Sequence, residues 1–314
     1  MPIHKGHIEL VEFAKSCAKQ VVVWLCISKQ EDAYPEHLRI QWVKDAFKKS
    51  PSVTVVVFYY DEKDLPSSSE PEMSIARPWA AAIQDNFQDI DCIVSSEQYG
   101  DNLSNLLGIH HIEFNPMSTV HATDIRKDPY KHWDRLTDSV KRYYQRKVCV
   151  VGTESTGKTT LVKTLSAFFN APYVAEVGRD LIKSPSDITK QKLEEVAVKH
   201  FHQIIKTCDK LTPLVFVDTD VNITKSYAQN VAGVVLDLDS SIDPGPKFDL
   251  YLYLCNDVAF VQDGTRLDES VRNRLDSSHR FHYAYNGIEI AELKGSHIAK
   301  LLKAIQLVQD LRFR

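Results

Sequence analysis

The sequence lacks any long hydrophobic segment. Its longest uninterrupted apolar run, Val21–Ile27, is too short to span a bilayer. No basic-then-apolar signal segment opens the chain. Cysteine is sparse, with six residues in 314 and no Cys-x-x-Cys pair, so reduced thiols are expected rather than a disulfide framework. Together these absences predict a cytoplasmic protein without stable membrane insertion.

The sequence also lacks a block of basic residues. It has 38 Lys and Arg against 42 Asp and Glu, for a net charge of −4. This balance disfavours a nucleic-acid partner and suits small substrates held by local charge. A hydrophobic fraction of 43% is typical of globular proteins. A homo-oligomer is compatible with the sequence, which leaves the oligomeric state open.

Apolar runs alternate with segments of helical spacing, which predicts an α/β fold with two parallel-sheet domains. We expect domains at 1–130 and 147–314, joined by a helical connector at 131–146. The predicted strands are Val21–Ile27, Val53–Tyr60, Ile90–Val94, Val148–Val151, Pro172–Val174, Leu214–Val217, Leu250–Leu254 and Ile288–Leu293. Helices are expected at Ile8–Phe13, Leu38–Phe47, Trp79–Phe87 and after residue 160.

A phosphate-binding loop of the form Gly-x4-Gly-Lys-Thr stands between a predicted strand and a predicted helix. Its backbone N–H groups converge on phosphate oxygens, and the helix turns its positive end toward them. This pattern predicts an ATP site in which Lys158 bridges the β- and γ-phosphates and Thr159 holds Mg²⁺. The full set of predicted loop residues is Gly152, Glu154, Ser155, Thr156, Gly157, Lys158, Thr159 and Thr160.

Acidic residues follow two other predicted strands. Asp218 ends the run Val215–Asp218 and is the expected second Mg²⁺ ligand. Glu176 and Arg179 are one helical turn apart and are expected to face one pocket, where the acid accepts a hydroxyl proton. Asp220 is a competing base, and the sequence does not separate the two. An ion pair of purely structural value is the alternative for Glu176 and Arg179.

The N-terminus carries a second set of candidate residues. His4-x-Gly6-His7 precedes a helical pattern and offers two imidazoles and backbone N–H groups to a triphosphate, although a polar helix cap has the same signature. Near the end of the same domain, Thr123 is expected to cap a helix, and Arg126 is expected to hold phosphates.

His110 and His111 are adjacent, so their side chains point apart on any regular element. A shared metal is therefore not expected, and an ordinary polar turn is.

These motifs occur together and in an order that resembles the NadR-type bifunctional nicotinamide-nucleotide adenylyltransferase and ribosylnicotinamide kinase. The resemblance covers nearly the whole chain. It is carried by Met1–His7, Val94–Gly100, Ala122–Pro129, Lys131–Asp134, Gly152–Thr160, Glu176–Arg179, Val217–Asp220 and Gln262–Arg266.

The resemblance implies two activities on small molecules. The first domain would join nicotinamide mononucleotide to the AMP part of ATP, with release of pyrophosphate. The second would pass the γ-phosphoryl group of ATP to the 5′-hydroxyl of nicotinamide riboside.

The resemblance also assigns individual residues. His4 and His7 match the histidines that steady the triphosphate, and Arg126 matches the arginine of the second motif. Trp79 stands where the family places an aromatic for the nicotinamide ring, with a core position as the alternative. Apart from the resemblance, Arg266, Arg272 and Arg274 lie in a glycine-containing, polar stretch typical of a mobile lid, whose arginines can neutralise the transferring phosphoryl group. A solvated basic helix face is the alternative for Arg272 and Arg274.

The chain departs from the family pattern at three places. It starts inside the first motif, without the central strand that normally precedes it, so we expect a gap in the first sheet. His121 replaces a serine. From these two departures we expect weak or absent adenylyltransfer, unless the start codon is assigned too late. In the kinase half, Asn256-Asp257-Val258-Ala259-Phe260 departs from Pro-Asp-x-Pro-Trp, so the family's substrate contacts are not carried over to that loop.

Other functions share parts of this pattern. A P-loop kinase for another nucleoside or small alcohol is one, and a nucleotide-sensing regulatory ATPase is another. A DNA-binding regulator is disfavoured, because no helix-turn-helix precedes His4 and the charge balance is acidic.

Overall fold

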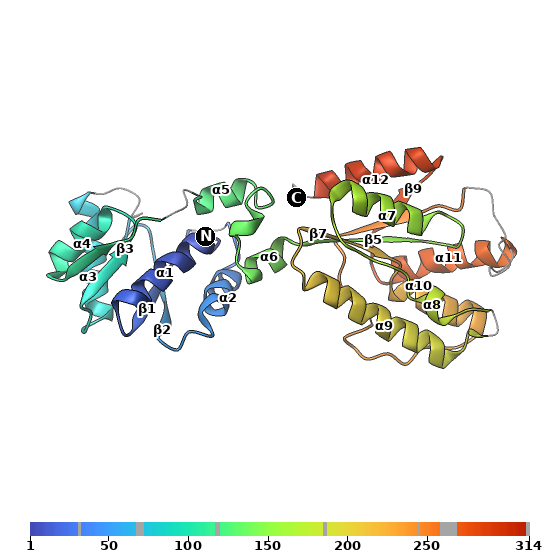
Figure 1. Cartoon of the computed structure of the whole chain (residues 1–314), viewed down its shortest axis with the longest axis horizontal. Coiled ribbons are helices and arrows are strands. Elements are labelled where there is room, and N and C mark those ends of the chain that lie inside the picture. The colour runs from blue at the N-terminus through green and yellow to red at the C-terminus, as the bar shows by residue number, and fades with distance from the viewer. Residues whose placement is uncertain are drawn as a thin grey trace. The chain divides into compact units, whose positions relative to one another are not determined.

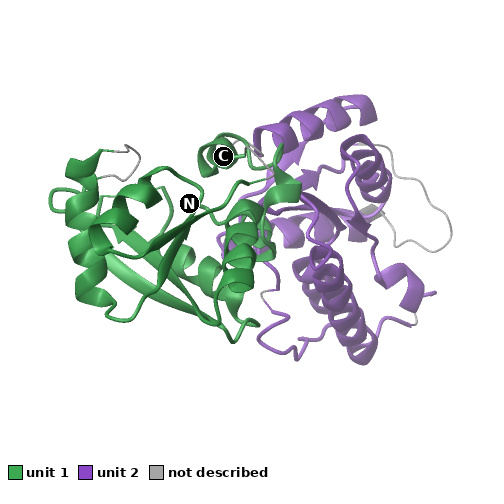
Figure 2. Ribbon diagram, turned by 60° about the vertical axis from the view of Figure 1, so that its left-hand side comes forward, with its two compact units in different colours: residues 1–143 green, residues 144–314 purple. Residues whose placement is uncertain are grey.

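The computed structural model describes residues 1–30, 33–66, 72–116, 120–184, 187–243, 245–257 and 269–311. The chain divides into two compact units, Met1–Tyr143 and Tyr144–Arg314, which Figure 2 colours separately. Both units are α/β with parallel strands, as predicted. The predicted connector contains a 3₁₀ turn, Trp133–Arg135, and the helix α6, Asp138–Tyr144.

The second unit is built on one five-stranded parallel sheet in the order β6-β7-β5-β8-β9. The strands are β5 (Arg146–Gly152), β6 (Tyr173–Val174), β7 (Leu214–Asp218), β8 (Leu250–Leu254) and β9 (Ala291–Leu293). All five predicted strands are therefore present, with small shifts at their ends. The central strand β5 pairs with β7 on one side and with β8 on the other.

Helices cover both faces of this sheet (Figure 1). Along β5, Val148 and Val150 pack with α7 (Lys158–Phe169) and α12 (His297–Leu311). Cys149 and Val151 face the other way, toward α9 (Lys190–Cys208), α10 (Val221–Tyr227) and α11 (Glu269–Tyr285). All four β5 side chains are fully buried, which explains why the strand reads as a continuous apolar run. The short helix α8 (Gly178–Leu181) and a π-helical turn (Ala228–Ala232) complete the unit.

The first unit contains two separate parallel strand pairs. β1 (Val21–Ser28) pairs with β2 (Val53–Tyr60), and β3 (Cys92–Ser95) pairs with β4 (His110–Glu113). Within the described residues no strand pairing joins the two pairs. The gap predicted for this sheet is therefore present, and one edge of β1 and one edge of β3 lack a strand partner there.

Five helices accompany these strands: α1 (Lys5–Cys17), α2 (Glu36–Phe47), α3 (Met73–Asn86), α4 (Tyr99–Leu107) and α5 (Ala122–Lys127). Residues from α3 and α4 form a core cluster with aromatic side chains of β1 and β2. Along the described parts of both units, no helix combines the length and apolar character needed to cross a membrane.

The polar turn expected at His110 and His111 is wrong, because both residues belong to β4. His111 fits a strand since its polar atoms have partners. Its Nδ1 lies 2.7 Å from Asp101 Oδ1, and its Nε2 lies 2.9 Å from Ser95 Oγ. The described residues contain no group of three or more metal-ligating side chains.

Candidate functional site

The phosphate loop links the end of β5 to the start of α7, and glycine is required at both of its ends. Gly157, the N-cap of α7, has φ +91° and Gly152 has φ +138°, values that other residues adopt only with strain. A Cβ atom at Gly152 would also lie 2.6 Å from the carbonyl oxygen of Leu254 on β8. The loop can therefore approach the neighbouring strand closely and present the N-terminus of α7 to an anion.

Lys158 is held inside the loop. Its side chain is buried, and its Nζ donates a hydrogen bond of 2.9 Å to the carbonyl oxygen of Thr153. The Thr156 hydroxyl donates to the same carbonyl at 2.8 Å. The ammonium group thus stands next to the main-chain donors that would face a phosphate.

Thr159 and Asp218, the two residues predicted to hold a metal, lie in direct contact. The Thr159 hydroxyl donates to Asp218 Oδ2 at 2.6 Å. Asp218 is fully buried, and its burial raises the pKa of the carboxyl group. Its other oxygen, Oδ1, has no hydrogen-bond partner in the described part of the chain. A buried carboxylate oxygen without a donor, beside a hydroxyl, fits the oxygen ligands that Mg²⁺ takes.

A cavity of about 350 Å³ adjoins the loop. Ser155 and Lys158 form its phosphate-loop end, and Glu176 and Arg179 line it as predicted. Arg179 Nε donates to Glu176 Oε2 at 3.1 Å, so the two residues form an ion pair that also faces the cavity. Its apolar wall comprises Val177, Ile182, Ile188, Leu193, Val196 and Ile223.

Asp220 is placed differently from Glu176. It is the N-cap of α10, where Oδ1 accepts the N–H of Ile223 at 3.1 Å and the hydroxyl of Tyr283 at 2.8 Å. Oδ2 accepts from Asn222 at 2.8 Å. Burial raises the pKa of this carboxyl group. With both oxygens engaged in a buried cap, Asp220 is less available than Glu176 to take a proton from a substrate.

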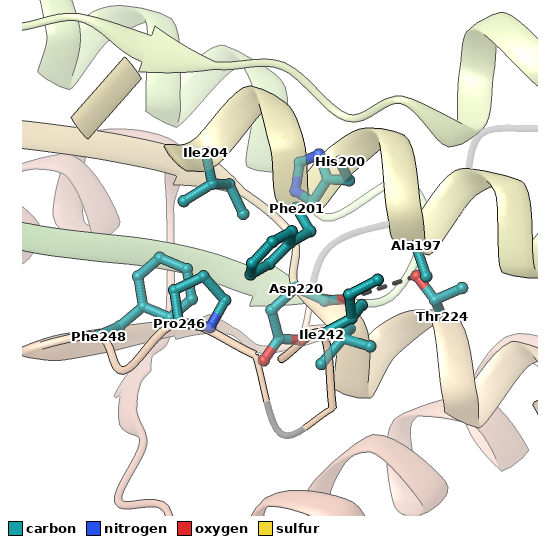
Figure 3. A pocket seen from close by; sticks show the side chains of 10 residues that line it. Ala197, His200, Phe201, Ile204, Asp220, Thr224, Ile242, Pro246 and Phe248 are labelled. Carbon is teal, nitrogen blue, oxygen red and sulfur yellow. Dashed lines mark hydrogen bonds between the residues drawn. The ribbon is translucent and has the colours of Figure 1, made fainter. Parts of the chain in front are cut away.

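Asp220 lines a separate and much smaller cavity (Figure 3). This cavity, of about 10 Å³, has His200 and Phe201 in its wall and has room for one water molecule. His200 Nε2 contacts the carbonyl oxygen of Thr219 at 3.1 Å. The space is too small for a nucleoside.

Arg266 and the rest of the stretch 258–268 lie outside the described residues. Of the two arginines that follow, Arg272 is buried and donates through Nη2 to the carbonyl oxygen of Asn256 at 3.1 Å. Arg274 is exposed.

The polar helix cap that was the alternative interpretation of the N-terminal histidines is present. His4 is the N-cap of α1, and its Nδ1 accepts the N–H of Gly6 at 3.1 Å. His7 Nδ1 accepts the N–H of His4 at 3.3 Å. Burial lowers the pKa of His4 to about 3 and that of His7 to about 4, so both rings are neutral at pH 7. Because each Nδ1 accepts, each Nε2 carries the proton and is a donor for an anion.

Arg126 lies in the same unit, and its guanidinium group donates hydrogen bonds to two groups of the protein itself. Its Nη1 donates to the carbonyl oxygen of Met1 at 2.7 Å and its Nη2 to Thr123 Oγ1 at 3.0 Å. The prediction that Thr123 caps this helix is wrong, because the N-cap of α5 is His121. The N–H of His121 donates to Asp124 at 3.0 Å, which fixes the helix start two residues earlier.

Trp79 occupies the core position that was the alternative to ring binding. Only 6% of its surface is exposed, and its indole Nε1 donates to the carbonyl oxygen of Pro66 at 2.8 Å. It packs edge-on against Trp24 and Tyr60.

Two residues near the phosphate loop were not predicted from the sequence. The hydroxyl of Tyr227, on α10, donates to Glu154 Oε1 at 2.7 Å. His279, on α11, is fully buried, and neither ring nitrogen has a hydrogen-bond partner among the described residues. Its ring centre lies 5.8 Å from that of Tyr227. Burial and the charge of Lys158 lower the pKa of His279 to about 3. No spacing pattern marks either residue.

Comparison with known proteins places the chain among NAD-metabolising relatives. A family model described as cytidylyltransferase-like matches residues 2–164, and one described as an AAA domain matches residues 147–299. The trifunctional NAD biosynthesis/regulator protein NadR of Escherichia coli (strain K12) is 25% identical, over 99% of this chain and 81% of that protein. The protein of the same name from Salmonella typhimurium (strain LT2) is 24% identical, with the same coverage.

Two solved structures share the fold of the whole chain. A NadR protein in complex with NR has a TM-score of 0.67 at 20% identity, covering 99% of this chain and 93% of that chain. A NadR protein with NAD and AMP-PNP has a TM-score of 0.66 at 20% identity, covering 100% and 94%. The resemblance inferred from the motifs, the two-part α/β fold and the transferase class are confirmed.

The buried, neutral His279 predicts a pH-dependent stability. The pKa of His279 is about 3 in the folded protein, below the usual 6.5. Between pH 6.5 and pH 3 the imidazole is therefore protonated in the unfolded chain but not in the folded protein. The free energy of unfolding falls as the pH drops through this range. The slope from this group is about 1.4 kcal/mol per pH unit. We expect the loss of unfolding free energy between pH 6 and pH 5 to be about 1.4 kcal/mol smaller in His279→Asn than in wild type. The measurement is urea unfolding followed by circular dichroism at the two pH values. The exposed His202→Asn is the control. A wild-type slope in His279→Asn would contradict the assignment.

Proposed function

This chain belongs to the cytidylyltransferase-like family, and we propose that it is a two-site transferase of NAD salvage. In this proposal the second unit phosphorylates nicotinamide riboside to nicotinamide mononucleotide, and the first unit adenylylates that product to NAD. The observation that carries the kinase assignment is the phosphate loop with its Thr159–Asp218 pair, next to a cavity that Glu176 and Arg179 line. The NadR relatives and the NR and AMP-PNP complexes of NadR structures support the substrates.

The kinase step follows from the positions of the residues. The loop N–H groups and Lys158, turning from the Thr153 carbonyl, hold the β- and γ-phosphates of ATP. Thr159 and Asp218 would hold Mg²⁺, which neutralises phosphate charge when bound. The riboside 5′-oxygen forms a bond to the γ-phosphorus while the bond to the β–γ bridging oxygen breaks. ADP leaves, and the hydroxyl proton passes to Glu176.

The first unit would use the Nε2 donors of His4 and His7, with Gly6 and Arg126, to hold a triphosphate. The phosphate group of nicotinamide mononucleotide would attack the α-phosphorus of ATP, and pyrophosphate would leave. Trp79 is buried in the core, which does not support a role in binding the nicotinamide ring. We place this protein in the cytoplasm. Its proposed partners are small molecules, and its oligomeric state stays open. The proposed domains are 1–130 and 147–314, with a helical connector at 131–146. Arg266 remains a lid residue in this proposal.

The acceptor is tested by offering nicotinamide riboside, thymidine and no acceptor separately with Mg-ATP, and measuring ADP. We expect riboside phosphorylation at least about 100-fold above the other two reactions. Lys158→Ala should lower it by a similar factor, because phosphate charge loses its buried cation. The exposed Lys163→Ala on α7 is the control.

Three other outcomes would contradict this assignment. A preference for thymidine would indicate a different nucleoside kinase, and equal ADP without an acceptor would indicate a regulatory ATPase. Activity that survives Lys158→Ala would show that the assigned loop is not the site.

The base is tested by comparing Glu176→Gln with Asp220→Asn. We expect Glu176→Gln to lower kcat by about 10² to 10³, the effect of losing a general base, with little change in unfolding. Asp220→Asn should cost about 1 kcal/mol of stability through the lost acceptor for Asn222, with kcat within a few-fold of wild type. The reverse pattern would make Asp220 the base.

Adenylyltransfer is tested by pyrophosphate release from nicotinamide mononucleotide and ATP. The strands of the first unit form two separate pairs, so we expect a rate at least about 100-fold below riboside phosphorylation, because small misplacements of catalytic groups cost that much. His4→Ala should remove any residual rate. Comparable rates in the two assays would refute the expectation.

A further inference from the structure

Glu154 is an acidic side chain within an anion-binding loop. The loop N–H groups, the N-terminus of α7 and Lys158 all attract negative charge to this place. A carboxylate near a phosphate oxygen repels it, because the two groups carry charges of the same sign. Phosphate binding therefore does not explain the acidic side chain of Glu154.

Tyr227 holds this carboxylate at the wall of the cavity. Its hydroxyl, on α10, donates to Glu154 Oε1 at 2.7 Å, and both residues line the cavity of about 350 Å³. Burial and the Glu154 charge raise the pKa of Tyr227 well above its usual value. The phenol therefore stays neutral and keeps its hydroxyl proton for the hydrogen bond to this carboxylate.

The cationic side chains of the same cavity have contacts of their own. Lys158 Nζ donates to the Thr153 carbonyl, Arg179 Nε donates to Glu176, and Lys183 Nζ donates to the Arg179 carbonyl at 3.1 Å. The remaining wall is largely aliphatic, including Leu193, Val196 and Ile223. Such a wall packs against a planar ring without choosing among rings by hydrogen bonds.

We propose that Glu154, oriented by Tyr227, makes the kinase select acceptors whose ring carries a positive charge. This inference rests on the proposed function, because the pyridinium ring of nicotinamide riboside is such a cation. An uncharged riboside of the same shape gains nothing from the carboxylate. Glu154 is then a specificity-determining residue, separate from the phosphate-binding task of the rest of the loop.

The test compares nicotinamide riboside with the neutral dihydronicotinamide riboside as acceptors. In wild type the cationic riboside should have the higher kcat/KM. In Glu154→Gln its kcat/KM should fall about 10- to 100-fold, the effect of losing an opposite charge a few ångströms away, while the neutral riboside changes less than about threefold. Tyr227→Phe should shift the ratio in the same direction by less. The control is Glu195→Gln, an exposed residue of α9.

A purely structural role of Glu154 gives a different result. ATP affinity without acceptor, measured by calorimetry, should stay equal or become tighter in Glu154→Gln, because a negative charge is removed near the triphosphate. An equal fall for both ribosides, or weaker ATP binding, overturns the inference and leaves the kinase assignment standing. Failure of wild type to phosphorylate either riboside overturns the proposed function itself.

Discussion

The hydrogen bond from the Thr159 hydroxyl to Asp218, 2.6 Å long, joins the helix that follows β5 to the end of β7. It depends on β5 lying between β7 and β8, with Val150 opposite Asp218 and Gly152 opposite Leu254. Because all three strands run parallel, their carboxyl ends meet at one edge of the sheet. Gly152 lets the loop pass the Leu254 carbonyl, and the phosphate loop, the Thr159–Asp218 pair and the cavity then share that edge.

Much of this site could be predicted from the sequence because its residue types are imposed locally. A strand buried on both faces reads as an apolar run, and the loop needs its glycines, lysine and threonine at fixed spacing. Tyr227 and His279 were not predictable, since they reach the loop through the packing of α10 and α11. The sequence also does not distinguish the positions of Glu176 and Asp220, because a residue in a cavity wall and a helix cap look alike in sequence.

The two units differ in the completeness of their sheets. In the second unit a continuous five-stranded sheet carries the phosphate loop, and Lys158, Glu176 and Arg179 line one cavity. In the first, two strand pairs stand apart, although His4 and His7 keep the geometry of neutral donors at the start of α1. Among the described residues, the strands of the second unit thus form one sheet and those of the first unit form two.

The most direct measurement is a crystal structure with a non-hydrolysable ATP analogue and Mg²⁺. The account predicts β- and γ-phosphates within hydrogen-bond distance of the backbone N–H groups between Gly152 and Thr160, with Lys158 Nζ moved from the Thr153 carbonyl to a phosphate oxygen. The cation would touch Thr159 and lie next to Asp218 Oδ1. An analogue bound elsewhere, with the loop empty and Lys158 still on the Thr153 carbonyl, would contradict it.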